Sequence, residues 1–234
     1  MLKIIRPLIR SFGVDIVRYH APTVHPPAQG YADLERKYPS LPELKLHFGC
    51  GPRVLKGWIN LDLFFEPYEN YLQYYKDAYA PAVRGTKDDF YAINIVTEGL
   101  PLPDNSVDLI FHEDFFEHLP QKEQIIFLAE TYRVMKPGGV HRINTPNLRA
   151  SMREHSDFKK GKAGVYVGEW INWHHFSVID PAILQSMAEI VGYSQIQFNS
   201  KNQSIAKDRL PVEYRPDDPG RVSLDGNVFA DLVK

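Results

Sequence analysis

The sequence predicts an α/β fold built on a mainly parallel β-sheet. Short apolar segments with the composition of strands recur along the chain, and segments whose apolar residues return every three to four positions lie between the later ones. Strands that alternate with helices are typical of a parallel sheet covered by helices. The chain has 234 residues, of which 44% are hydrophobic and 24% are charged. It is therefore long enough for one domain with a well-buried core.

The predicted strands follow one another from Leu44 onward. Each is a short apolar run, and several stop at a glycine, a proline or an acidic residue. The segments are 44–49, 57–63, 90–96, 106–113, 138–146, 194–200 and 226–233.

Helices are predicted between and after these strands. The segment 120–139 has apolar residues at helical spacing until a Pro-Gly-Gly sequence stops the helix. A later helix begins with Asp180 as the N-cap and Pro181 in the first turn, and it ends before Gly192. A shorter helix is expected at 31–38.

The chain divides into an N-terminal extension, 1–42, and one domain, 43–234, with an aromatic-rich insertion at 64–90. Residues 1–12 place apolar and basic side chains on opposite faces of a helix, which Pro7 interrupts. Two interpretations of this segment stay open: packing on the domain or on a partner subunit, and peripheral contact with a membrane surface. A proline-rich connector follows it.

The composition excludes several classes of protein. The formal net charge of −2 argues against a general nucleic-acid binder, and no apolar run of about 18 residues predicts a transmembrane helix. A single cysteine excludes an internal disulfide, which fits a cytoplasmic location. No cysteines and histidines have zinc-site spacing, so we expect no metal. His112, His118, His174 and His175 could meet at one ion only through the fold.

The first predicted strand leads into Gly49-Cys50-Gly51, and the second ends near Asp62. Glycine lets the backbone turn sharply and lie close to a ligand, and ligands of such sheets bind beyond the carboxyl ends of the strands. An acidic residue there can accept hydrogen bonds from both hydroxyls of a ribose. Only 11 residues separate Gly51 from Asp62, against about 20 in a dinucleotide fingerprint, whose third glycine is also missing. The pattern therefore favours a nucleoside ligand other than NAD.

Three segments carry a resemblance to a known family. "LHFGCGPRVLKGWINLDL" (46–63) resembles the cofactor motif of class I S-adenosylmethionine-dependent methyltransferases. The run 99–148, with "LPDNSVDLI", "EHL" and "RVMKPGG", resembles the type 11 subgroup, and "HHFSVIDPAILQSMAEIVGY" (174–193) resembles its histidine-plus-helix segment. The resemblance covers residues 44–199. It implies a Rossmann-like sandwich, a mostly parallel seven-stranded sheet with helices on both faces, and S-adenosylmethionine as the cofactor.

The resemblance also assigns residues to that cofactor. They are Gly49, Cys50, Gly51, Asp62, Leu63, Asn94, Ile95 and Glu113. The glycine turn would line the methionine and ribose part, and Asp62 would accept hydrogen bonds from the ribose hydroxyls. The pair 94–95 would border the adenine, where the amide of Asn94 can bond the amino group in place of the usual aspartate. Glu113 would face the methionine end and the substrate mouth.

The acceptor would meet the insertion 64–90 and the stretch 147–178. The aromatic residues of the insertion form either a small core or a lid that stacks on a sugar or another planar ring. His174 or His175 is the candidate catalytic base, because a hydroxyl acceptor must lose its proton; the alternative is a pair that packs or anchors the loop. His118 is interpreted as an internal hydrogen-bond anchor.

A small molecule or a glycan is the expected acceptor, and a sugar hydroxyl is favoured. This preference follows from the resemblance of the "GWIN" motif to proteins of bacterial surface-polysaccharide pathways, which is an analogy at the level of the fold. Two alternatives stay open: a natural-product O- or N-methyltransferase, and a catalytically silent binding protein of the same fold.

Overall fold

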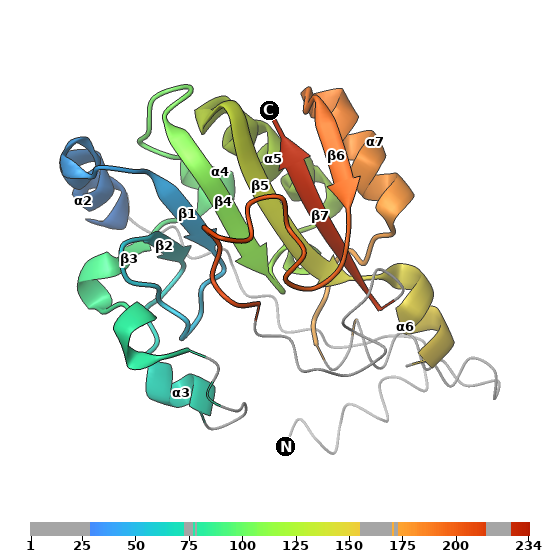
Figure 1. The fold of residues 1–234 in the computed structure, drawn as a ribbon, viewed down its shortest axis with the longest axis horizontal. Helices are drawn as coiled ribbons and strands as arrows, with labels where there is room; N and C mark the ends of the chain where they lie inside the picture. The colour runs from blue at the N-terminus through green and yellow to red at the C-terminus, as the bar shows by residue number, and fades with distance from the viewer. Residues whose placement is uncertain (1–28, 73–76, 78, 155–169, 171–172, 214–225) are drawn as a thin grey trace, which may run out of the picture.

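The computed structural model describes residues 29–72, 77, 79–154, 170, 173–213 and 226–234. These residues form a seven-stranded sheet with helices packed against it (Figure 1). The strands are β1 (Lys45–Phe48), β2 (Ile59–Asp62), β3 (Phe90–Ala92), β4 (Val107–Glu113), β5 (Met135–Pro146), β6 (Gln195–Phe198) and β7 (Asn227–Val233). The α-helices are α2 (Gln29–Lys37), α3 (Tyr68–Leu72), α4 (Ile95–Glu98), α5 (Gln121–Val134), α6 (Leu148–Glu154) and α7 (Pro181–Val191). The short 3₁₀ helices are η1 (Tyr38–Ser40), η2 (Pro81–Val83), η3 (Lys87–Asp89) and η4 (Phe116–His118).

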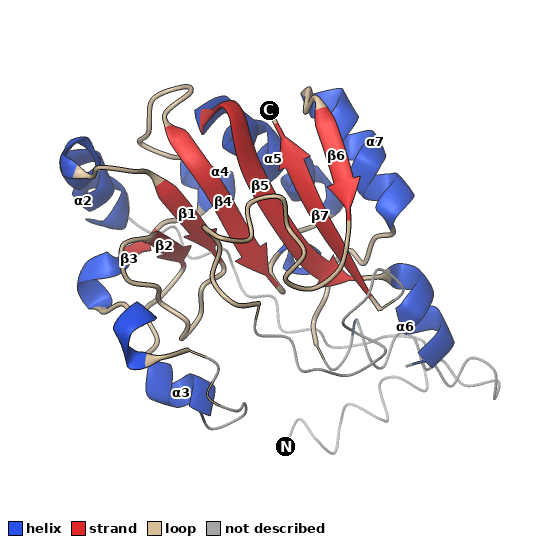
Figure 2. Ribbon diagram, viewed as in Figure 1, coloured by secondary structure: helices blue, strands red, loops and turns tan. Residues whose placement is uncertain are grey.

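The sheet has the strand order β3-β2-β1-β4-β5-β7-β6. Strands β1 to β5 run parallel, and β7 runs antiparallel between β5 and β6 (Figure 2). The mostly parallel, seven-stranded sheet is therefore confirmed. The strand order reverses between the neighbours β1 and β4, and in open sheets of this kind ligands bind at such a point, beyond the carboxyl ends of the strands.

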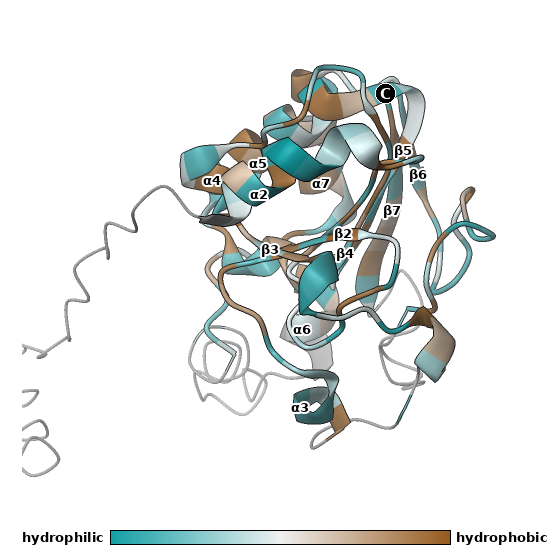
Figure 3. Cartoon of the chain, turned by 90° about the vertical axis from the view of Figure 1, so that its left-hand side faces the viewer, coloured by the Kyte–Doolittle hydropathy of each residue, from teal (hydrophilic) through white to brown (hydrophobic). Residues whose placement is uncertain are grey.

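Two hydrophobic clusters pack on the sheet. Helices α4, α5 and α7 lie on one face (Figure 3), where the larger cluster includes Phe48 of β1, Phe127 of α5 and Leu184 of α7. A smaller cluster contains Phe111 of β4 and Ala206. Ala206 belongs to the segment 199–213, which crosses in front of the sheet in Figure 1.

The late helix begins and ends as its sequence predicts. Asp180 is the N-cap of α7, and its side chain accepts a hydrogen bond from the Ile183 N–H (3.0 Å). Gly192 follows the last turn in the left-handed conformation, with φ of 116°. Both ends of α7 are thus fixed by local chemistry.

Two predicted boundaries are wrong. The predicted strand 90–96 ends at Ala92, because the side chain of Asn94 accepts a hydrogen bond from the Val96 N–H (3.1 Å) and starts helix α4. The helix predicted within 120–139 ends at Val134, before the Pro-Gly-Gly sequence, and β5 begins at the next residue. In the first case a side-chain cap overrides the apolar pattern. In the second case the chain passes from helix to strand without a loop.

The predicted extension lies mostly outside the described residues, as does the whole segment 1–12. Its last part contains α2, which begins two residues before the predicted helix 31–38. Among the helices that the structure describes, none is long and apolar enough to cross a membrane.

Candidate active site

The loop after β1 turns through two glycines in the left-handed conformation. The φ angle is 56° at Gly49 and 46° at Gly51, values at which a residue with a side chain is strained. A Cβ atom on Gly49 would lie 2.7 Å from the Cβ atom of Phe115, whereas a Cβ atom on Gly51 would meet nothing within 4 Å. Packing therefore requires glycine at position 49, and Gly51 faces open space.

A cavity of about 360 Å³ opens beside this turn, at the carboxyl ends of β1, β2 and β4. Its volume is in the range of small-molecule sites. Its walls are formed by Phe48, Gly49, Gly51, Leu61, Asp62, Leu63, Ile93, Asn94, Ile95, Val96, Asp114, Phe115, His118, Leu119 and Glu123. The predicted cofactor residues among them are Gly49, Gly51, Asp62, Leu63, Asn94 and Ile95.

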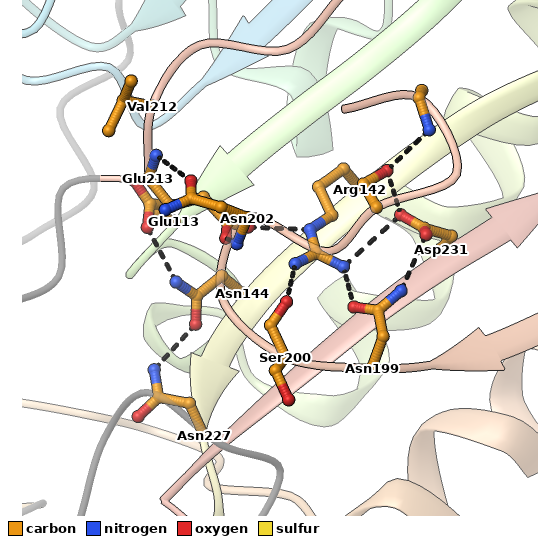
Figure 4. A network of polar contacts seen from close by, with 12 residues as sticks. Glu113, Arg142, Asn144, Asn199, Ser200, Asn202, Val212, Glu213, Asn227 and Asp231 are labelled. Carbon is orange, nitrogen blue, oxygen red and sulfur yellow. Dashed lines mark hydrogen bonds and ion pairs between the residues drawn. The ribbon is translucent and has the colours of Figure 1, made fainter. Parts of the chain in front are cut away.

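The other two predicted cofactor residues, Cys50 and Glu113, are not part of these walls, and both side chains are buried. Burial raises the pKa of the Cys50 thiol, so it stays protonated and fills the turn. Glu113 accepts hydrogen bonds from Arg53 (3.1 Å) and from Asn144 (2.7 Å). Asn144 in turn accepts one from Asn227 (2.7 Å), so Glu113 belongs to a buried polar chain that joins β4, β5 and β7 (Figure 4).

Asp62 ends β2 inside the cavity wall. Its Oδ2 atom accepts a hydrogen bond from the Gly51 N–H (2.9 Å), and its Oδ1 atom accepts one from the Leu63 N–H (2.7 Å). Burial raises the pKa of Asp62, and these two N–H groups offset part of that rise. Each carboxylate oxygen keeps a second lone pair. The carboxylate is thus held at the cavity with acceptor capacity for two hydroxyls.

Asn94 belongs to the cavity wall, and its side-chain oxygen is bonded to the first turn of helix α4. The Oδ1 atom accepts hydrogen bonds from the N–H groups of Val96 (3.1 Å) and Thr97 (3.4 Å). The oxygen therefore caps α4, and the Nδ2 group is the part of the side chain that suits a ligand. An N–H donor fits an adenine ring nitrogen, whereas the adenine amino group would need an acceptor.

The turn after β4 carries a carboxylate that the sequence reasoning missed. Glu117 in η4 is fully buried, and its Oε2 atom accepts a hydrogen bond from the hydroxyl of Thr145 (2.9 Å). Its backbone oxygen accepts hydrogen bonds from the N–H groups of Phe176 (2.8 Å) and Ser177 (3.1 Å). These bonds fasten the segment 173–177 to η4. The signal in the sequence was an acidic residue in an otherwise apolar run, "FFEHL".

The two histidines proposed as the base have different surroundings in this segment. The Nε2 atom of His175 lies 3.9 Å from the Oε1 atom of Glu117, and the ring of His175 lies 4.9 Å from the ring of His118. His174 is exposed and has a positive φ of 57°. Burial lowers the pKa of His118 to about 4, with a further contribution from His175. His118 is therefore neutral near pH 7, and its side chain lines the cavity and forms a hydrogen bond with the backbone of His174.

The insertion 64–90 packs most of its described tyrosines on one another. Tyr68 stacks on Tyr71 with 5.2 Å between ring centroids, and Tyr71 and Tyr79 are each 3% exposed. The hydroxyl of Tyr79 donates a hydrogen bond to the Val212 carbonyl (3.0 Å). These rings form a small core that ties the insertion to the segment 199–213.

A buried arginine anchors the same segment to the sheet. Arg142 of β5 is fully buried and donates hydrogen bonds to Glu213 (2.7 Å), to the Ser200 carbonyl (3.0 Å) and to Asn199 (Figure 4). It also forms an ion pair with Asp231 of β7 (3.4 Å). One guanidinium thus holds both ends of the segment 199–213.

The strand order, the glycine turn and the acid after β2 define the fold class. A solved structure of an S-adenosylmethionine-dependent methyltransferase from Archaeoglobus fulgidus shares this fold, with a TM-score of 0.50 and 15% identity over 87% of this chain and 92% of that one. The fold is thus the Rossmann-like fold of class I methyltransferases.

A sequence match points to the same class of protein. Residues 46–143 match the type 11 family model, which is described as a methyltransferase domain. This part of the chain is thus similar to a methyltransferase domain, in agreement with the fold. A probable S-adenosylmethionine-dependent methyltransferase of Mycolicibacterium smegmatis is 48% identical over 48 residues, which are 20% of this chain and 18% of that protein.

Proposed function

We propose that the protein is an S-adenosylmethionine-dependent methyltransferase of small molecules or glycans, and that its acceptor is a sugar hydroxyl. The observation that carries the first part is the carboxylate of Asp62, held by two backbone N–H groups at the wall of a cavity of about 360 Å³. This arrangement fits a ribose, and open space beside Gly51 lets the ligand approach the backbone. When bound, S-adenosylmethionine supplies an electrophilic methyl group on a sulfonium sulfur.

The residues of the cavity have distinct binding roles in this proposal. Asp62 accepts hydrogen bonds from the two ribose hydroxyls. Leu63 and Ile95 supply apolar contacts for the adenine, and Asn94 donates from Nδ2 to a ring nitrogen. The main contribution of the protein to the reaction is alignment of the acceptor with the methyl group.

Features beside the cavity support the sugar acceptor. Trp173 is 60% exposed and Phe176 is 66% exposed, and both lie in the segment that Glu117 fastens to η4. Exposed aromatic faces suit stacking on the apolar faces of sugar rings. His174 and His175 stand between them as candidate acceptors of the hydroxyl proton.

The test of the cofactor is calorimetric titration with S-adenosylhomocysteine. We expect micromolar binding by the wild type and a loss of about 1–3 kcal/mol, or about 5-fold to 150-fold in affinity, for Asp62→Ala. Asp88→Ala is the matched control, because Asp88 is exposed in η3 and should bind as the wild type does. Equal affinity in both variants would remove Asp62 from the site.

The test of the base uses an acceptor found by screening sugars and nucleotide sugars. Replacement of both His174 and His175 by alanine should lower kcat at least tenfold to a hydroxyl acceptor, since general-base catalysis typically contributes about 100-fold or more. S-adenosylhomocysteine should still bind the variant. Full activity of the double variant would exclude both residues as the base.

A second candidate function is binding without catalysis. The observation that favours it is Asn94, whose side-chain oxygen caps α4 and is turned away from the role of the usual aspartate. A folded wild type that does not bind S-adenosylhomocysteine would support this function.

A further inference from the structure

Three side chains that can bind a metal ion meet at the edge of the cavity. Glu117, His118 and His175 each offer a ligand atom within 4.8 Å of the other two. Glu117 and His118 are neighbours in η4, and His175 arrives from a distant part of the sequence through the backbone bonds that Phe176 and Ser177 make to Glu117. Spacing along the sequence predicts no metal, but the fold brings these ligands together.

The donor set and its geometry suit a first-row divalent cation. Two imidazoles and one carboxylate bind such ions and leave coordination positions open. Glu117 Oε1 and His175 Nε2 are 3.9 Å apart, which is longer than a hydrogen bond. Ligand atoms at about 2.1 Å from one ion are roughly 3.0–3.5 Å from each other. Side-chain movements of about 1 Å would therefore close the site around an ion.

A hydrogen bond to its second oxygen already orients the carboxylate of Glu117. The hydroxyl of Thr145 donates to Glu117 Oε2 at 2.9 Å, and both residues are fully buried. Oε1 is the oxygen nearer to His175. Hydrogen bonds of this kind fix the orientation of metal ligands in known sites.

We propose that Glu117, His118 and His175 bind one first-row divalent cation, and that this cation holds the oxygen atoms of the acceptor. His118 lines the cavity, so the ion lies where the cofactor and the acceptor would meet. Two adjacent hydroxyls of a sugar can fill two open positions of the ion. The second half of the proposal rests on the proposed function, whereas binding of the ion does not.

The cation would act on the acceptor hydroxyl. A lone pair of the acceptor oxygen forms the bond to the methyl carbon, and the electron pair of the carbon–sulfur bond moves to sulfur, which gives S-adenosylhomocysteine. The hydroxyl proton leaves to a water molecule. A cation beside the oxygen lowers the pKa of the hydroxyl and so eases this loss. His175 then holds the ion and is not the base.

The experiment is a titration of chelator-treated protein with Mn²⁺ alone, followed by the electron paramagnetic resonance signal of free Mn²⁺. We expect one ion per chain, and at least a tenfold loss of affinity for Glu117→Gln and for His175→Ala. His118→Ala should show the same loss and is the variant least expected to disturb folding, because this residue is the most exposed of the three. Thr145→Val should lose about tenfold, as outer ligands do. The matched controls are His174→Ala and Glu123→Gln, which should keep the wild-type affinity.

The outcomes separate this proposal from the proposed function. Binding of S-adenosylhomocysteine is measured on the same metal-free samples, and circular dichroism reports whether each variant is folded. Absence of Mn²⁺ binding by a wild type that binds S-adenosylhomocysteine overturns the metal site and leaves the methyltransferase proposal standing. Equal Mn²⁺ affinity in the wild type and in folded His118→Ala likewise overturns it. Mn²⁺ binding that depends on all three residues supports the site even where no acceptor is methylated.

Discussion

At the residue scale, Gly49 and Gly51 have the same backbone conformation but different surroundings. Both lie in the left-handed region, which costs a residue with a side chain about 1–2 kcal/mol. Only Gly49 is also in tight contact, because its Cβ position is 2.7 Å from Phe115. The backbone and the packing contributions can therefore be separated at this turn.

We expect Gly49→Ala to destabilise the protein more than Gly51→Ala does. Gly51→Ala should lower the free energy of unfolding by about 1 kcal/mol through backbone strain alone. Gly49→Ala should add an overpacking cost of about 1–3 kcal/mol. Urea unfolding of both variants measures the difference, and equal losses would show that Phe115 moves aside without cost.

At this scale, two features that lie at the cavity can be recognised in the sequence because they are local. A glycine turn and Asp62 are each read from a few neighbouring residues, and both lie at the cavity. The meeting of Glu117 with His175 could not be predicted, because it depends on backbone hydrogen bonds between distant segments. The burial of Glu113 beneath Arg53 was missed for the same reason.

At the element scale, the segment 199–213 has hardly any regular secondary structure and is held by side chains. Its described contacts include Glu213 and Asn199 on Arg142, and Val212 on Tyr79. The sequence predicts no helix or strand between residues 200 and 226. A pattern of apolar and polar residues does not distinguish a buried arginine from an exposed one. The anchoring role of Arg142 could therefore not be predicted from the sequence.

Removal of the guanidinium should release this segment. Arg142→Met leaves the carboxylates of Glu213 and Asp231 buried without their ion pair, and breaking a buried pair from one side costs about 3–5 kcal/mol. We expect that loss in urea unfolding, together with faster hydrogen exchange in 199–213. The matched control is Arg36→Met on α2, whose exposed pair with Asp33 should contribute less than about 1 kcal/mol. Similar losses in both variants would contradict the anchoring role.

At the scale of the whole molecule, three strands of the sheet carry histidines in the protein interior. His47, His112 and His141 are all fully buried. Burial lowers the pKa of His47 and of His112 to about 3, and it lowers the pKa of His141 well below the usual value. The folded protein therefore keeps these rings neutral where the unfolded chain would protonate them.

Acid should consequently lower the free energy of unfolding already at pH values above those at which carboxylates titrate. The unfolded pKa near 6.5 exceeds the folded values, so the stabilisation is complete above pH 6.5 and is lost as the pH falls toward 3. His47 and His112 should each cost about 2 kcal/mol between pH 6.5 and pH 5. Urea unfolding at pH 7.5 and pH 5 measures the change.

His112→Phe should remove about one histidine's share of that loss, or about 2 kcal/mol. The ring of His112 stacks on Phe116 and meets Phe127 edge-on, so phenylalanine keeps the aromatic packing. Phe116→Leu is the control, because it disturbs the same cluster and leaves the titrating groups in place. An unchanged pH dependence in His112→Phe would mean that this ring is protonated in the folded state.

The position of β7 has a consequence for biosynthesis. This strand is the last of the seven to be translated, yet it pairs with β5 on one side and β6 on the other. Until β7 has emerged from the ribosome, β5 has an open edge and β6 lacks its neighbour in the sheet. A nascent chain in which only the first six strands have been made cannot complete the sheet. Its unpaired strand edges are of the kind that chaperones shield from aggregation.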